Sequence, residues 1–175
     1  MIECKYELSV DKSLKERLSK DYNKRALERN SEEVFSSDRG GSTALLLRAL
    51  FKNYNKSAKI VGTSLCNKIL EDEECRKRLD MFELPVKILL TNSPNEISNK
   101  IKNYFTTKYS KTQIKEIKGY VIQNIDKKLE TDFLILDNIA YFVELTNFKL
   151  ARCSFNNIEG ALNLSNQFDN IYNND

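Results

Sequence analysis

The sequence predicts an α/β domain in which a mixed β-sheet is sandwiched between helices. Between residues 43 and 109, apolar stripes with helical spacing alternate with short apolar runs typical of buried strands. In the last third, two such runs flank the dipeptide Asp137-Asn138, which indicates a β-hairpin. The chain has 175 residues, enough for one ordinary domain with a continuous core.

An extra helix is predicted near the N-terminus, within residues 8–29. Its apolar stripe has fourfold spacing and consists of Leu14, Leu18, Tyr22 and Ala26. Residues 30–42 are polar and contain two adjacent glycines, which indicates a loop before the next helix. We therefore assign residues 1–42 to an N-terminal amphipathic helix and polar loop, and residues 43–175 to the α/β domain.

Two short buried strands are predicted at residues 59–62 and 86–90, joined by a helix that ends near Leu79. Helices with one apolar face precede the first strand and follow the second, at residues 43–54 and 97–109. Strands joined by a helical crossover run parallel. We therefore expect these two strands to be parallel.

The last third predicts a different arrangement, with a hairpin made by residues 133–136 and 139–143. Asp and Asn tolerate the left-handed conformation that its tight turn requires. Partly alternating apolar residues indicate another strand around 114–125. We expect one more strand at 158–164 and a short closing helix at 165–172.

Composition excludes several classes of function. The chain contains no histidine, and its 28 basic and 25 acidic residues give a net charge of +3, too mild to indicate a nucleic-acid-binding protein by itself. Its four cysteines lie far apart without a C-x-x-C pair, so we expect buried free thiols rather than a zinc site, and no cofactor. The N-terminus lacks a signal peptide's apolar stretch, and no apolar run approaches the roughly 20 residues that span a bilayer. We expect a cytoplasmic protein without a membrane span.

One part of the sequence resembles the phospholipase D-like superfamily. The segment from Glu130 to Asp137 is followed after six residues by Glu144-Leu145-Thr146-Asn147-Phe148, and further on by Glu159. The family motif is similar: His-x-Lys, four residues, Asp, about six residues, Gly-Ser-x-Asn and then an acidic residue. Upstream, the segments Lys59-Ile60-Val61-Gly62-Thr63-Ser64 and Leu84-Pro85-Val86-Lys87-Ile88-Leu89-Leu90 resemble two strands of the family.

The resemblance covers roughly residues 43–172 and implies the α/β fold of the family. Within the motif, Asp137 matches the aspartate, Asn147 the asparagine and Glu159 the downstream acid. The nucleophilic histidine is replaced by Glu130, and the lysine by Asp132. Glu144 and Leu145 stand where the family has Gly-Ser. Single-copy members of the superfamily resemble half of the double enzyme and commonly pair around this motif, which implies a homodimer.

These replacements remove the family's chemistry. Its reaction needs one imidazole as nucleophile and a second as general acid, while a lysine stabilises charge on the phosphoryl oxygens. Glu130 and Asp132 would instead present negative charge to a phosphate and repel it. A homodimer would not restore the site, because neither copy contains a histidine. We therefore expect no catalytic residue.

Three interpretations of the altered acidic positions stay open. We favour a decayed site whose carboxylates are solvated or paired with nearby basic side chains. The acids could instead converge on a divalent cation through their oxygens, or the pocket could recognise a cationic or polar group of a partner. For Asn147 and Glu159 we favour a structural role, satisfying backbone groups near the hairpin.

The leading hypothesis is a catalytically inactive phospholipase D-like domain that acts as a binding or regulatory module through protein contacts, as a homodimer with a partner still unidentified. The first alternative is a nucleic-acid-binding module that does not cleave. Its candidate phosphate contacts are Arg39, just before a predicted helix N-terminus, and Lys111 and Lys115. The second alternative is a metal-dependent phosphodiesterase that uses the acidic cluster.

Overall fold

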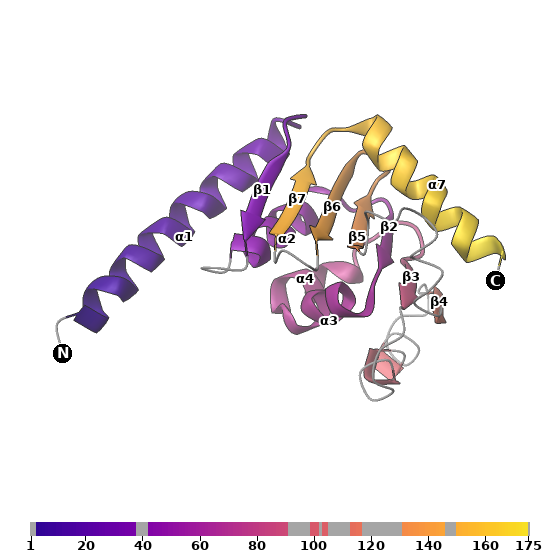
Figure 1. Ribbon diagram of the computed structural model, residues 1–175, viewed down its shortest axis with the longest axis horizontal. Coiled ribbons are helices and arrows are strands. Elements are labelled where there is room, and N and C mark those ends of the chain that lie inside the picture. The colour runs from indigo at the N-terminus through magenta and orange to yellow at the C-terminus, as the bar shows by residue number, and fades with distance from the viewer. Residues whose placement is uncertain are drawn as a thin grey trace.

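The computed structural model describes residues 3–37, 42–90, 99–101, 103–104, 113–116, 131–145 and 150–174. Within this part of the chain, seven strands form one sheet in the order β1-β7-β6-β5-β2-β3-β4 (Figure 1). The strands are β1 (Val34–Ser37), β2 (Ala58–Val61), β3 (Lys87–Leu90), β4 (Gln113–Glu116), β5 (Thr131–Leu136), β6 (Ala140–Leu145) and β7 (Leu150–Ser154). The helices are α1 (Glu3–Leu27), α2 (Ser42–Asn53), α3 (Thr63–Glu71), α4 (Glu73–Leu79) and α7 (Ile158–Asn174), and residues 99–101 and 103–104 are also helical.

The sheet is mixed, as predicted. Strands β2, β3 and β4 are parallel, with Ile60 opposite Ile88. The pairs β2–β5, β5–β6, β6–β7 and β7–β1 are antiparallel. The parallel pairing of the strands predicted at 59–62 and 86–90 is confirmed, and the α3–α4 segment forms the crossover between them.

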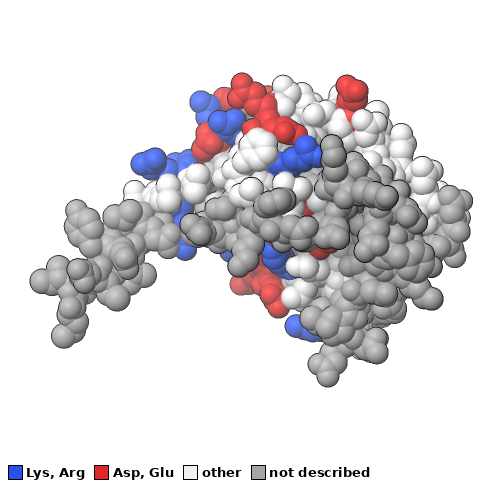
Figure 2. Space-filling model, viewed as in Figure 1, with Lys and Arg blue, Asp and Glu red and all other residues white. Residues whose placement is uncertain are grey.

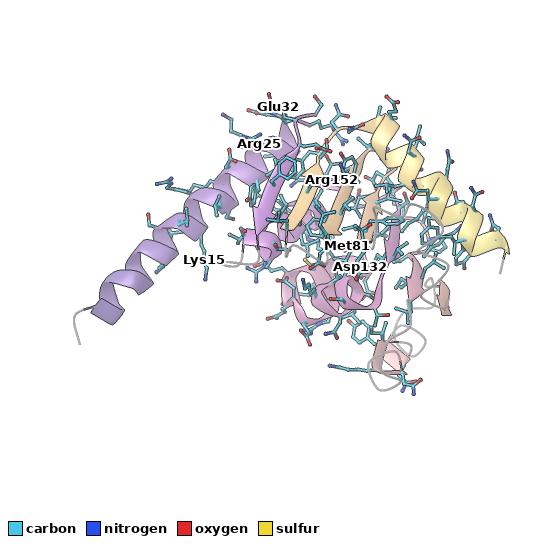
Figure 3. All side chains as sticks on the ribbon, viewed as in Figure 1. Lys15, Arg25, Glu32, Met81, Asp132 and Arg152 are labelled. Carbon is cyan, nitrogen blue, oxygen red and sulfur yellow. The ribbon has the colours of Figure 1, made fainter. Side chains whose placement is uncertain are left out.

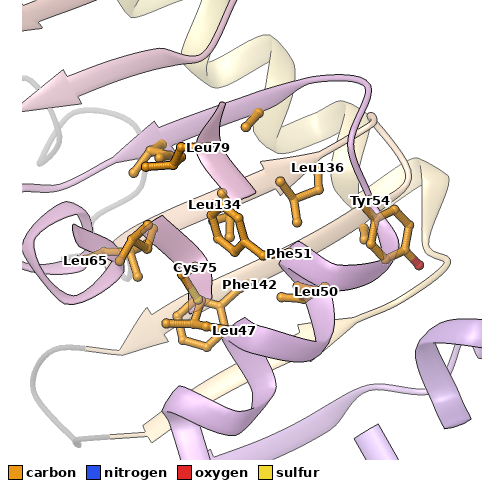
Figure 4. Packing of buried hydrophobic residues seen from close by; sticks show 14 of the residues in the cluster. Leu47, Leu50, Phe51, Tyr54, Leu65, Cys75, Leu79, Leu134, Leu136 and Phe142 are labelled. Carbon is orange, nitrogen blue, oxygen red and sulfur yellow. The ribbon is translucent and has the colours of Figure 1, made fainter. Parts of the chain in front are cut away.

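Helices cover both faces of the sheet. One face carries a core that includes Phe51 of α2, Leu65 of α3 and Leu134 of β5 (Figure 4). The other face packs against α7, where Phe133 of β5 and Phe168 lie in one cluster. Alternate residues of a strand point to opposite faces, and β5 supplies apolar residues to both. This explains why its last four residues, Phe133 to Leu136, form a continuous apolar run.

The predicted hairpin between β5 and β6 is confirmed. Asp137 and Asn138 both have φ of 56°, the left-handed values that a two-residue type I′ turn requires. Tyr54, at the end of α2, donates its buried hydroxyl to the carbonyl of Phe155 and so joins α2 to the segment after β7.

Several sequence-based expectations are wrong in detail. Strand β1 lies inside the stretch 30–42 that was expected to be a loop, and β7 was not expected at all. The strand expected at 158–164 is the first half of α7, because Ala161, Leu164, Phe168 and Ile171 repeat with helical spacing and are buried on one side.

The helix expected to run to Leu79 is interrupted at Asp72. The Asp72 side chain accepts hydrogen bonds from the backbone N–H groups of Glu74 and Cys75, and so caps α4. Most of the helix expected at 97–109, and most of the strand expected around 114–125, lie outside the described residues.

The C-terminal half of helix α1 packs on the rest of the molecule. Tyr22 and Ala26 are buried, whereas Leu14 is 43% exposed. Figure 1 shows the N-terminal half of α1 extending away from the sheet. The domain boundary at residue 42 stays a prediction, although β1 before it pairs with β7. No helix in the described ranges has both the length and the apolar character needed to cross a membrane.

Candidate functional site

The motif positions lie at two opposite ends of the β5–β6 hairpin. Asp132 and Glu144 are directly opposite each other at the open end. Asp137 lies in the turn at the other end, roughly 16 Å farther along β5 at the rise of an extended strand. Glu159 is exposed in the first helical turn of α7. This end of α7 lies near the β5–β6 hairpin turn, because the backbone N–H of Asn157 donates a hydrogen bond to the carbonyl of Ile139. The four described acids therefore do not converge on one pocket.

Several predicted site residues cannot be placed. Glu130, Asn147, Arg39 and Lys111 lie outside the described residues. Lys115 belongs to β4, and only its backbone is described. The roles assigned to these positions stay predictions.

Asp132 lies between the sheet and α3 (Figure 3) and is only 8% exposed. Its Oδ2 accepts a hydrogen bond of 3.0 Å from the backbone N–H of Leu65, in the first turn of α3. The N-cap residue of α3, Gly62, has no side chain for this purpose. The carboxylate of Asp132 therefore caps the helix from a neighbouring strand, where the helix dipole favours negative charge.

The chain before α3 accommodates this contact only because position 62 is glycine. Gly62 has φ of 109°, a conformation that residues with a Cβ rarely adopt. A Cβ added there would lie 1.9 Å from Cγ of Asp132. The Asp132 side chain can therefore occupy this position only when residue 62 has no Cβ.

Glu144 is also buried, at 7% exposure, and forms an ion pair with Lys68 of α3. Its second oxygen, Oε2, is buried and has no hydrogen-bond partner among the described residues. Asp132 and Glu144 thus face the same helix, one through a backbone amide and the other through a lysine ammonium. With both acids ionised, this group has two negative charges and one positive charge.

The surroundings of Asp132 alter its acidity. Burial is the largest cause and raises the pKa of Asp132 to about 6. The hydrogen bond from Leu65 opposes this shift, the negative charge of Glu144 adds to it, and the positive charge of Lys68 opposes it. Asp132 therefore holds a proton more tightly than an exposed aspartate does.

Asp137, the position that matches the family aspartate, has a structural role here. Its Oδ1 accepts hydrogen bonds from the backbone N–H groups of Lys56 and Ser57, at 2.8 and 2.9 Å. The hairpin turn is thereby fixed to the segment that leads into β2. Asp137 supports the frame of the hairpin and is not part of the Asp132–Glu144 group.

Sequence reasoning missed two residues of this group, Gly62 and Lys68. Gly62 stands between a predicted strand and a predicted helix, where a glycine indicates a special backbone conformation or a close approach. That signal was present in the sequence. Lys68 gave no comparable signal, because it lies 76 positions away from Glu144 in the sequence.

The arrangement is poorly suited to binding phosphate. The amide of Leu65, which could otherwise bind an anion at the start of α3, already binds the Asp132 carboxylate. Nor does the described part of the chain contain a group of three or more Cys, Asp or Glu residues placed to hold a metal ion. Cys66, Cys75 and Cys153 are free and buried, and burial raises the pKa of each thiol.

Nuc and TrmBL2 are among the solved structures that are similar to this chain, whereas no family model and no curated protein matches it. Nuc from Salmonella typhimurium, a phospholipase D family member, has a TM-score of 0.59 and 15% sequence identity, covering 82% of this chain and 95% of Nuc. TrmBL2, an archaeal chromatin protein whose structure shows a novel mode of DNA binding, has a TM-score of 0.58 and 15% identity, covering 98% of this chain. The chain spans 64% of the length of TrmBL2.

Both similarities are at the level of fold. Together with the mixed sheet and its helical layers, they confirm the predicted phospholipase D-like α/β fold.

Proposed function

We propose that this chain is a non-catalytic domain of phospholipase D-like fold that acts as a binding or regulatory module through protein contacts. The observation that carries the proposal is the inward orientation of Asp132, which stands at the motif position where the family has lysine. Instead of facing a substrate, it caps α3 and is packed against Gly62. Asp132 therefore stabilises the fold.

The chemistry of the neighbouring groups supports the same conclusion. The chain has no histidine to attack phosphorus or to protonate a leaving group. Glu144 is engaged by Lys68, so this lysine is already paired with a carboxylate of its own chain. Two buried carboxylates next to a phosphodiester would repel it.

An activity assay tests the absence of catalysis. The full chain is incubated with bis(p-nitrophenyl) phosphate in the presence of Mg²⁺, Mn²⁺ or Ca²⁺, alongside the Glu130→Gln/Asp132→Asn double variant. We expect no release of nitrophenolate by either protein, and identical heats when each is titrated with the three metals in a calorimeter. Turnover or metal binding that is lost in the double variant would support the metal-dependent phosphodiesterase instead.

Self-association is the second part of the proposal, and α1 is its most suitable surface. Described residues 12–17 of this helix are all exposed, and an isolated helical stretch of this length is marginally stable in water. Packing against the same helix of a second copy would cover Leu14 and extend the buried stripe formed by Tyr22 and Ala26.

Analytical ultracentrifugation tests this pairing. We expect a dimer mass for the wild-type chain and a shift toward monomer for Leu14→Lys. Ser13→Lys adds the same charge one position away and serves as the matched control, which should stay dimeric. A strict monomer at high concentration would exclude the homodimer.

A non-cleaving nucleic-acid-binding module is the second candidate function, because TrmBL2 is described as binding DNA. Figure 2 shows Lys and Arg interspersed with Asp and Glu on the face in view rather than gathered in one basic patch. Fluorescence anisotropy with duplex DNA at 50 and 200 mM salt would test it, since contacts to phosphates weaken steeply with salt. Lys111→Glu and Lys115→Glu should then weaken binding, and Lys77→Glu on α4 serves as control. Absence of binding at the lower salt concentration would exclude this candidate.

A further inference from the structure

We propose that Asp132 and Glu144 share one proton as a buried carboxyl–carboxylate pair, which makes the attachment of α3 to the β5–β6 hairpin sensitive to pH. This goes beyond the proposed function and does not depend on which partner the domain binds. Three observations support it: the register of the two strands, the burial of both side chains, and an oxygen of Glu144 that accepts no hydrogen bond from the described residues.

The register places the two side chains next to each other. Asp132 and Glu144 are directly opposite on antiparallel strands, where the Cβ atoms of such partners lie about 4.5–5.5 Å apart. Both side chains point to the same face, because Asp132 accepts from the backbone of α3 and Glu144 pairs with Lys68 on that helix. Their carboxyl groups are therefore close neighbours.

The charges facing the pair do not balance when both acids are ionised. Helix α3 contributes the Lys68 ammonium and the thiol of Cys66, which burial keeps neutral by raising its pKa. The turn after β2 contributes Gly62, which has no charge. Among the described residues, two buried carboxylates thus share one cation, and the remaining negative charge is costly away from water.

A single proton on the pair would remove the excess negative charge and would also supply a hydrogen-bond donor, which Glu144 lacks. Oε2 of Glu144 is a buried acceptor without a partner among the described residues, and such atoms are destabilising. Protonation of Asp132 adds an O–H donor to a pair that otherwise contains only acceptors. The pair then has one negative charge, which Lys68 neutralises.

The pKa of Asp132 is shifted upward, as expected for a carboxyl group that keeps its proton in this arrangement. Burial, with the charge of Glu144 adding to it, raises the pKa of Asp132 to about 6. The folded chain therefore binds a proton that an unfolded aspartate would release near pH 4. Near pH 6 the group changes from neutral to negatively charged, at the contact that holds the start of α3.

Carbon-13 NMR of the carboxyl groups tests the proposal on the full chain between pH 4 and 8. We expect the Asp132 Cγ signal to titrate near pH 6. In Glu144→Gln the Asp132 midpoint should fall by about one pH unit, because a neighbouring negative charge is removed. The matched control Glu71→Gln, on the exposed side of α3, should leave the midpoint unchanged.

Lys68→Gln provides a second, opposite test, since losing the cation should raise the Asp132 midpoint. An Asp132 midpoint near pH 4 in the wild-type chain would overturn the proposal, and this measurement needs no variant to fold. So would a midpoint that is the same in Glu144→Gln as in the wild type, because Asp132 would then titrate independently of Glu144.

Discussion

Replacing Gly62 with alanine changes the contact that joins β2, α3 and β5, and two costs follow from the structure. At φ of 109° an alanine occupies a strained conformation, which costs on the order of 1–3 kcal/mol. Its Cβ would also lie 1.9 Å from Cγ of Asp132. The carboxyl group must then leave the amide of Leu65, which costs roughly 1.5–3 kcal/mol for a hydrogen bond to a charged group. We expect Gly62→Ala to lower the free energy of unfolding by about 3–5 kcal/mol.

Urea unfolding followed by far-ultraviolet circular dichroism measures this loss, and a double-mutant cycle separates the two costs. In an Asp132→Ala background the clash is absent, so Gly62→Ala should cost only its backbone part. The difference between the two backgrounds should be about 1.5–3 kcal/mol. Gly160→Ala, whose Cβ would meet the ring of Tyr141, serves as control and should cost the same in both backgrounds. A Gly62→Ala cost below about 1 kcal/mol, or an equal cost with and without the Asp132 side chain, would refute this account.

Three further effects follow from single contacts. Asp137→Ala should lower the free energy of unfolding by about 2–4 kcal/mol in urea titrations, because two backbone N–H groups lose their acceptor. The control Glu159→Gln should change this free energy by less than about 0.5 kcal/mol. Tyr54→Phe should cost about 1–3 kcal/mol in the same titration, since the carbonyl of Phe155 loses its buried donor. Because the pKa of Asp132 is raised to about 6 in the folded state, its proton stabilises the fold below pH 4, and this contribution is lost as pH rises through 6. The free energy of unfolding at pH 4 and at pH 7 should differ by about 2 kcal/mol from this group, and Asp132→Asn should remove that difference.

Much of the fold could be predicted because its elements have regular periodicity. The continuous apolar run of β5, the left-handed Asp137-Asn138 turn and the crossover between β2 and β3 each have a local sequence signal. These signals arise from the residues of the element itself and do not require knowledge of the partners.

The errors occurred where a local pattern was ambiguous or where tertiary contacts decide the structure. Residues 158–164 contain too few apolar positions to separate a strand from a helix, and only the continuation to Phe168 and Ile171 shows the helical repeat. Strand β1 has only four residues, too few for a clear sequence pattern, and it is stabilised by its pairing with β7. The break at Asp72 depends on capping, which competes with continuation of the helix.

For the candidate site, the sequence singled out Asp132, Glu144, Asp137 and Glu159 through a resemblance to a motif, but it did not indicate how they are arranged. Strand periodicity places Asp132 and Asp137 at different ends of β5, and this could be inferred in advance. That Asp132 turns inward to cap α3, and that Lys68 compensates Glu144, could not. Both facts depend on how α3 crosses the sheet, which joins residues far apart in the sequence.

Placing lysine at position 132, the residue type of the phospholipase D-like motif that the sequence resembles, should destabilise this domain. An ammonium group would face the positive end of the α3 dipole and would lie near Lys68 and the crowded Gly62. We expect Asp132→Lys to cost about 3–5 kcal/mol, the penalty of leaving a buried charge uncompensated, while the matched variant Asp132→Asn costs less because an amide oxygen still accepts from Leu65. Urea unfolding at pH 7 compares the two. Equal stability of Asp132→Lys and the wild type would mean that position 132 still tolerates either charge, and that α3 has not been rebuilt around the aspartate. A large loss confined to the lysine variant would mean that the fold itself requires an acceptor without positive charge at position 132.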